Sequence, residues 1–347
     1  MVSRTSEIQA DGSIVANPPL WIDALACQNL KVNIEGRHVT LIFPRVAQPD
    51  DNRRIIELAE PTYRRAPIPR PKISPDFGWG YYDVEHQKML VMALRFRTTV
   101  PTKARSQSRD GFTDRPLDWL RGAWPEWLDT AQNWLRGWND IYLHRSDDTA
   151  SFEWVDAAAE WQPDTRRGKA SVSHSVISYG SQKSASLAQI QSAFYCASER
   201  LPLPTAHRFI LRAYASRMEQ DLRGCVIDAC TAAETAISMR ISEELAASGV
   251  VKNASEMIVR NANGIIGLYR LASQIGLVFN ESQHQVQSGL ATSRNAAVHR
   301  GEIPDDKQAR EALRVAKSLV DVAKPLPNAE TLLRRSVSSA RTTHKRP

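Results

Sequence analysis

The chain has 347 residues, of which 42% are apolar and 24% are charged, and its mean hydropathy is −0.39. This composition excludes a membrane protein, a collagen-like repeat and a wholly disordered chain, and the length predicts two domains. The formal net charge is +7. Residues 1–175 are neutral overall, whereas the last 14 residues carry five basic side chains and no acidic one. The charge therefore does not predict a basic face on either domain.

The N-terminal part is predicted to be mostly β. Leu30–Ile34 and His38–Phe43 alternate apolar and polar residues around Glu35 and Gly36, which is typical of a hairpin. Residues 89–100 predict a further strand.

A helical pattern follows between Pro116 and Leu143, and Pro125 suits its first turn. Its large apolar residues fall near one face: Trp124, Leu128, Leu135 and Trp138. A tryptophan-rich stripe of this kind is either core or a platform for a ligand or partner. We interpret it as core, because large aromatic side chains are usually buried.

From Leu187 onward the pattern is helical. The expected helices cover residues 187–201, 206–247, 254–275, 281–300 and 306–323, and glycine or proline separates them. Gly224 is a candidate break within the second of these helices. Short connections between helices predict an antiparallel bundle. The predicted fold class is therefore α+β, with a mostly-β N-terminal domain that carries a helical insertion, followed by an all-α bundle. The predicted boundaries are 1–165 for the first domain, 166–186 for a linker, 187–325 for the bundle and 326–347 for a basic, disordered tail.

The four cysteines show neither CxxC pairing nor the spacing of metal ligands, and we expect them to be small apolar fillers in a reducing compartment. They are Cys27, Cys196, Cys225 and Cys230. The sequence has no apolar run of signal-peptide or transmembrane length. We therefore expect a cytoplasmic protein without a membrane span.

The segment with the clearest chemical content is Ser293–Gly301, in which Arg294 and Asn295 precede His299. The pairs Arg167 with His174 and Arg200 with His207 have a similar spacing. The first pair lies in a Ser/Gly-rich stretch and the second spans two prolines, so neither fits on one helix. Only Arg294 and His299 have a helical context on both sides.

Helix geometry places this segment relative to the expected core. Val286, Leu290 and Ala297 form an apolar stripe, and Arg294 falls on the same stripe. A guanidinium in that position needs an acceptor or a shared interface. Asn295 and His299 are four residues apart and are neighbours on the adjoining face. The alternative is that Arg294 is a buried structural residue and His299 favours the negative end of its helix.

A carboxylate on an earlier helix is a candidate partner. Glu234 lies within an apolar run formed by Ile227, Cys230, Ala233 and Ile237. It either orients Arg294, or lies beside the site, or is a glutamate at the boundary of the core.

An Arg followed by four to six residues and a His, late in the third long helix of a bundle, resembles the motif of the HEPN superfamily (higher eukaryotes and prokaryotes nucleotide-binding), many of whose members are ribonucleases. The resemblance covers roughly residues 187–325. It implies a metal-independent endoribonuclease in which the ribose 2′-OH attacks the adjacent phosphorus and leaves a 2′,3′-cyclic phosphate. In this role His299 performs acid–base work, Arg294 binds phosphate oxygens, and Asn295 donates a hydrogen bond or positions the substrate.

The resemblance also implies partners. Similar domains pair so that two motif helices form a composite cleft, so a homodimer is expected, with RNA such as tRNA as substrate and no cofactor or metal. A β-rich domain followed by such a bundle resembles ApeA-type abortive-infection proteins of bacteria, which implies a toxin or antiphage defence effector whose first domain responds to a protein or small-molecule trigger.

Two alternatives remain open. One is a non-catalytic HEPN bundle that serves as a dimerisation or nucleotide-binding module in an adaptor protein. The other is one half of a toxin–antitoxin pair with a nucleotidyltransferase.

Overall fold

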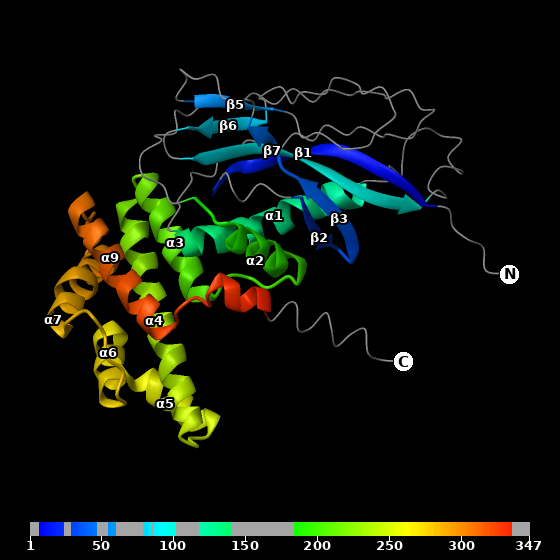
Figure 1. Cartoon of the computed structure of the whole chain (residues 1–347). Coiled ribbons are helices and arrows are strands. Elements are labelled where there is room, and N and C mark those ends of the chain that lie inside the picture. Colours follow the sequence, from blue (N-terminus) through cyan, green and yellow to red (C-terminus); the bar gives the residue numbers. More distant parts are fainter. Residues whose placement is uncertain are drawn as a thin grey trace, which may run out of the picture. The chain divides into compact units, whose positions relative to one another are not determined.

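The computed structural model of the chain describes residues 7–23, 29–46, 55–59, 79–84, 87–101, 118–139 and 184–334 (Figure 1). The chain divides into two compact units. One comprises residues 1–135, 145–202 and 328–347, and the other comprises residues 136–144 and 203–327. The first contains an antiparallel sheet and the second is helical, so the predicted α+β class is confirmed.

The central strand of the sheet is β7. The strands are β1 (Glu7–Asp23), β2 (Leu30–Ile34), β3 (Arg37–Ile42), β4 (Arg45–Val46), β5 (Ile55–Ala59), β6 (Gly80–Asp83) and β7 (Lys88–Pro101). They lie in the order β2-β3-β7-β6-β5-β4, and β1 also pairs with β7 (Figure 1). Because β7 pairs with three strands, its side chains from Met89 to Phe96 are mostly buried.

The predicted hairpin is confirmed in β2 and β3. Glu35 and Gly36 connect them with φ angles of 50° and 77°. Two consecutive residues with positive φ are typical of the turn whose twist matches that of paired strands, and glycine adopts this conformation without strain. Leu30, Val32 and Ile34 are buried on one face of β2, as the alternation of apolar residues predicted.

Strand β1 was not predicted from the sequence. It is antiparallel to β7 over nearly its whole length, but its register shifts between Val15 and Leu20. The intervening residues include Pro18 and Pro19, which have no N–H to donate to a neighbouring strand. The prolines therefore coincide with a bulge in a strand that continues on both sides.

Helix α1 (Asp118–Asn139) is the predicted helical insertion. Three residues of its predicted stripe, Trp124, Leu128 and Leu135, are buried in the core, whereas Trp138 is half-buried. Trp124 is 1% exposed and stacks on Trp127 with ring centroids 5.3 Å apart. The Trp127 ring in turn contacts Phe194 at 5.0 Å. The prediction for Pro125 was wrong, since the helix begins at Asp118 and Pro125 lies inside it. Leu120, on the N-terminal side of Pro125, is buried. Its packing stabilises the part of the helix that precedes the proline.

Helix α2 (Leu187–Ser198) belongs to the unit that contains the sheet, whereas the sequence assigned it to the bundle. Ser186 caps its first turn by accepting from the Gln189 N–H, and the Gln189 side chain accepts from the Ser186 N–H. Just before it, the end of the predicted linker joins the sheet, because the Asp23 N–H donates to the Ala185 carbonyl at 2.9 Å. Residues 166–183 of the linker lie outside the described residues.

The prediction of a disordered tail from residue 326 was wrong for its first part. Residues 329–334 are helical, and Ala329 and Leu332 are buried. The Ser192 hydroxyl of α2 donates to the Ala329 carbonyl at 2.6 Å. This burial compensates for the ordering of the chain there. Residues 335–347 lie outside the described residues.

The second unit is built around helix α4. Its elements are α3 (Thr205–Met218), α4 (Leu222–Ala247), α5 (Lys252–Asn261), α6 (Gly264–Gln274), α7 (Gln283–Val286), the π-helical turn η3 (Gln287–Ala291), α8 (Thr292–His299) and α9 (Asp306–Ala323) (Figure 1). Helix α4 packs against α3, α5, α6, α8 and α9. Small buried side chains along it let these helices approach closely: Ala229, Cys230, Ala232, Ala233 and Ala236.

Two predicted helices are each divided in the structure, and the first division lies just before the candidate break at Gly224. The chain leaves α3 after Met218, and Asp221 starts α4 by accepting from the Gly224 N–H at 2.8 Å. Helices α5 and α6 are separated at Ala262 and Asn263. None of the helices that the structure describes is long and apolar enough to span a bilayer.

The last turn of α1 belongs to the helical unit. The Trp138 indole N–H donates to the Pro327 carbonyl at 3.0 Å. A Cβ at Gly137 would lie 3.0 Å from Leu326 and 3.1 Å from Leu203, so the glycine permits close packing there. The unit is therefore assembled from two separate stretches of sequence.

Candidate functional site

The predicted motif lies on one helical segment that includes a wide turn. This segment consists of α7, η3 and α8, and the predicted uniform helix over 281–300 is therefore only partly correct. In η3 the Thr292 N–H donates to the carbonyl of Gln287, five residues earlier, and the Thr292 hydroxyl donates to the same carbonyl at 2.8 Å. Such i to i+5 turns are frequent at functional sites.

The predicted apolar stripe is confirmed. Val286, Leu290 and Ala297 are fully buried. Arg294 is half-buried, while Asn295 and His299 are exposed. The motif therefore lies where the helix passes from core to solvent, and its polar groups are accessible to a ligand.

The three motif side chains meet around one atom of Arg294. Nη1 of Arg294 donates to Oδ1 of Asn295 at 3.3 Å, and it also lies 3.3 Å from Nε2 of His299. Arginine and histidine are five residues apart, about 140° around an α-helix, so the long arginine side chain spans that angle. The cluster joins a permanent cation, an amide and an imidazole at an exposed surface.

The end of α8 supports this arrangement. His299 is its last residue, and the N–H groups of Arg300 and Glu302 both donate to the Ala296 carbonyl. Gly301 has φ 69°, a left-handed conformation that glycine adopts readily at a helix end. The Arg300 side chain is paired with Glu302 and not with the motif.

Glu234 lies on α4, which packs against α8, and it is half-buried. Cys230 lies one turn earlier on the same helix and is buried. Burial raises the pKa of the Cys230 thiol, Glu234 raises it further, and Arg294 opposes both. Cys230 thus lies within the electrostatic influence of both charged groups. No ion pair between Glu234 and Arg294 occurs in the described part of the chain, so a direct contact is not the means by which one orients the other.

The other two cysteines with described positions have raised thiol pKa values for the same main reason, burial. Cys196 and Cys225 are buried and free, and burial raises the pKa of each thiol to about 12. The prediction that they are apolar fillers is confirmed for Cys196, Cys225 and Cys230, while Cys27 lies outside the described residues. Across the described ranges, no group of three or more His, Cys, Asp or Glu side chains is arranged to hold a metal ion.

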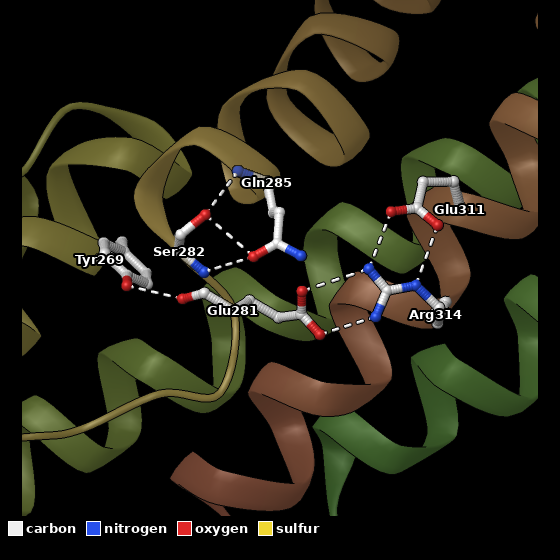
Figure 2. Close-up of polar contacts among 6 residues, drawn as sticks. All are labelled: Tyr269, Glu281, Ser282, Gln285, Glu311 and Arg314. Atoms are coloured by element: carbon white, nitrogen blue, oxygen red, sulfur yellow. Dashed lines mark hydrogen bonds and ion pairs between the residues drawn. The ribbon is translucent and has the colours of Figure 1, made fainter.

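A second polar cluster fixes the start of the motif segment, and Figure 2 shows it. Glu281 is 6% exposed, and both of its carboxylate oxygens accept from Arg314 of α9, at 2.7 and 3.2 Å. Arg314 also pairs with Glu311, which lowers the pKa of the Glu311 carboxyl, and these two carboxylates together raise the pKa of Arg314. The Tyr269 hydroxyl donates to the Glu281 carbonyl at 2.7 Å.

The capping box that follows Glu281 was detectable in the sequence. Ser282 and Gln285 have the required spacing, and each side chain accepts from the backbone N–H of the other. The partner of Glu281 was not detectable, because Arg314 is 33 residues away and on another helix. Together these contacts hold the beginning of the motif segment against α9. Helix α9 forms one side of the helical core, and Arg294 lies at the edge of this core.

Comparison with known proteins gives no relative. No protein-family model matches the chain, and no curated protein or solved structure is significantly similar to it.

Proposed function

We propose that this chain is a metal-independent endoribonuclease that acts as a toxin or antiphage defence effector. The observation that carries the proposal is the contact of Arg294 with both Asn295 and His299 on an exposed part of the helical unit. An imidazole that can take up a proton and a guanidinium that binds two phosphate oxygens are the groups that cleavage of RNA by its own 2′-OH requires.

In this reaction Arg294 binds the phosphodiester and stabilises the charge that develops on its nonbridging oxygens. His299 takes the proton of the ribose 2′-OH, the 2′-oxygen forms a bond to phosphorus, and the bond from phosphorus to the 5′-oxygen breaks. The departing 5′-oxygen takes its proton from solvent water. The products are a 2′,3′-cyclic phosphate and a 5′-OH end, and Asn295 holds Arg294 beside the substrate.

A homodimer is the proposed active form. One copy supplies one guanidinium and one imidazole, whereas a phosphodiester in its transition state presents several charged oxygens. Two motif helices that face each other would double the donors around one phosphate. The proposed location is the cytoplasm, where free cysteines such as Cys196 stay reduced.

The sheet-containing unit is proposed to bind the trigger. Residues 1–175 have no net charge, and most of the positive charge of this unit lies in the last 14 residues, which favours a protein or small molecule over the backbone of a nucleic acid as the ligand of the sheet. The alternative function is a non-catalytic bundle in an adaptor protein. The cluster of Arg294, Asn295 and His299 favours the nuclease, since a purely structural bundle has no need of these side chains at its surface.

The first test is incubation of the purified full-length protein with total RNA and with tRNA in excess EDTA. We expect cleavage that EDTA does not reduce, with 5′-OH ends that a polynucleotide kinase phosphorylates directly and 3′ ends that resist ligation until the cyclic phosphate is removed. Products with 5′-phosphates, or cleavage abolished by EDTA, would contradict the mechanism. No cleavage of either RNA would favour the adaptor.

Glu234 is proposed to orient Arg294 through its charge, since α4, which carries Glu234, packs against α8, which carries Arg294. Glu234→Gln keeps the size of the side chain but removes its charge, and we expect the rate constant of RNA cleavage to fall about tenfold, equivalent to about 1.4 kcal/mol. The measurement is kcat and KM with a tRNA substrate. The matched control is Glu244→Gln on the same helix, where the carboxylate pairs with Arg240. An unchanged kcat in Glu234→Gln would show that Glu234 is only a residue at the core boundary.

A further inference from the structure

The contact between Arg294 and His299 determines which ring nitrogen of the neutral imidazole carries the proton. A guanidinium stays protonated in proteins, and its nitrogens donate hydrogen bonds but do not accept them. Nη1 of Arg294 lies 3.3 Å from Nε2 of His299, so Nε2 is the acceptor in this pair. A neutral imidazole that accepts at Nε2 carries its proton on Nδ1.

We propose that Arg294 holds His299 in the Nδ1–H tautomer until a phosphodiester displaces it, so that Nε2 is the atom that takes the 2′-OH proton. This inference rests on the proposed ribonuclease function. Without RNA, the lone pair of Nε2 is occupied by the Arg294 N–H. A phosphate oxygen carries negative charge and is a stronger acceptor than a neutral ring nitrogen, and two such oxygens match the guanidinium fork. Arg294 therefore transfers its hydrogen bonds to the phosphate and leaves Nε2 open beside it.

The proton leaves the 2′-oxygen for Nε2, which makes His299 a cation with protons on both ring nitrogens. The 2′-oxygen bonds to phosphorus, the bond to the 5′-oxygen breaks, and water protonates that oxygen. Loss of the proton from Nε2 to water then restores the neutral imidazole, and Arg294 returns to it when the product leaves.

Asn295 is the positioning residue of this exchange. Its Oδ1 accepts from the same Nη1 that contacts His299, also at 3.3 Å. One acceptor therefore stays on the guanidinium while the other is exchanged for phosphate, which restricts how far Arg294 moves. The neighbouring cation does not replace Arg294, because Arg300 is paired with Glu302.

The test is ¹⁵N NMR of the full-length protein with labelled histidine, in which His299 is assigned by comparison with His299→Ala. At a pH where the ring is neutral, we expect the wild type to show a protonated Nδ1 and an unprotonated Nε2. In Arg294→Met we expect the ring to shift towards the Nε2–H tautomer, which free histidine prefers. The matched control is Arg300→Met, which also removes an arginine beside His299 and should leave the tautomer unchanged.

A second arm uses the wild type alone and stays decisive if Arg294→Met does not fold. Addition of a deoxydinucleotide, which has the phosphodiester but no 2′-OH, should shift the Nε2 resonance of His299, because its donor leaves for the phosphate. A wild-type ring with its proton on Nε2, or no response to the deoxydinucleotide, would overturn the inference. The tautomer is read without RNA cleavage, so an inactive wild type with the expected tautomer would reject the nuclease and retain the Arg–His pair.

Discussion

His299→Ala should reduce the rate of RNA cleavage by about 10²–10⁴-fold, the usual contribution of a general base. The imidazole is exposed and contacts Arg294 at the surface, so its loss should leave the helical core intact. The measurement is the single-turnover rate constant with a defined tRNA, together with the thermal unfolding midpoint and circular dichroism of the variant. We expect the rate to fall and both structural measurements to match the wild type.

The same segment offers a matched control in His284. This histidine is exposed on α7, and the contact at its position is made by its backbone carbonyl, which accepts from the Ser288 hydroxyl at 2.9 Å. His284→Ala keeps that carbonyl, so cleavage should stay at the wild-type rate. If His299→Ala retains full activity while it is folded, the cleavage does not arise from this motif and the proposed mechanism fails.

Trp124→Ala should lower the free energy of unfolding by about 3–5 kcal/mol, the usual cost of removing a buried tryptophan. Trp124 is 1% exposed, and it stacks on Trp127, so truncation leaves a large cavity between aromatic rings. The measurement is urea unfolding of the full-length protein, followed by tryptophan fluorescence and by circular dichroism.

The control for this substitution is Trp124→Phe, which keeps an aromatic ring against Trp127 and should cost less. The result distinguishes the two interpretations of the tryptophan stripe. A loss below about 1 kcal/mol for Trp124→Ala would be typical of a surface position. That outcome would contradict a core role for the stripe and would favour its use as a ligand platform.

Local sequence patterns predicted the elements whose conformation depends on residues within a short stretch of sequence. The hairpin followed from Glu35 and Gly36, where the turn type requires two residues with positive φ. The buried stripe of Val286, Leu290 and Ala297 followed from helical spacing. By contrast, β1 was missed because Pro18 and Pro19 interrupt its alternation, although pairing with β7 continues on both sides of them.

Contacts between distant residues account for what the sequence left out of the candidate site. The neighbouring positions of Asn295 and His299 were predicted from their spacing of four. The meeting of Arg294 with His299 depends on the rotamer of a long side chain, which spacing does not specify. The wide turn η3 and the anchoring of Glu281 by Arg314 depend on packing against α9, which no local signal near residue 281 reveals.

The helical unit is built from two separate stretches of the chain, so a fragment cut at a single position does not contain all of it. A fragment that starts at residue 187 would lack Gly137 and Trp138, and the Pro327 carbonyl would lose its indole donor. It would also carry α2 without the sheet strands and tryptophans that cover its apolar side. Gene fusion or recombination within the predicted linker, residues 166–186, would therefore yield a bundle that lacks these packing contacts.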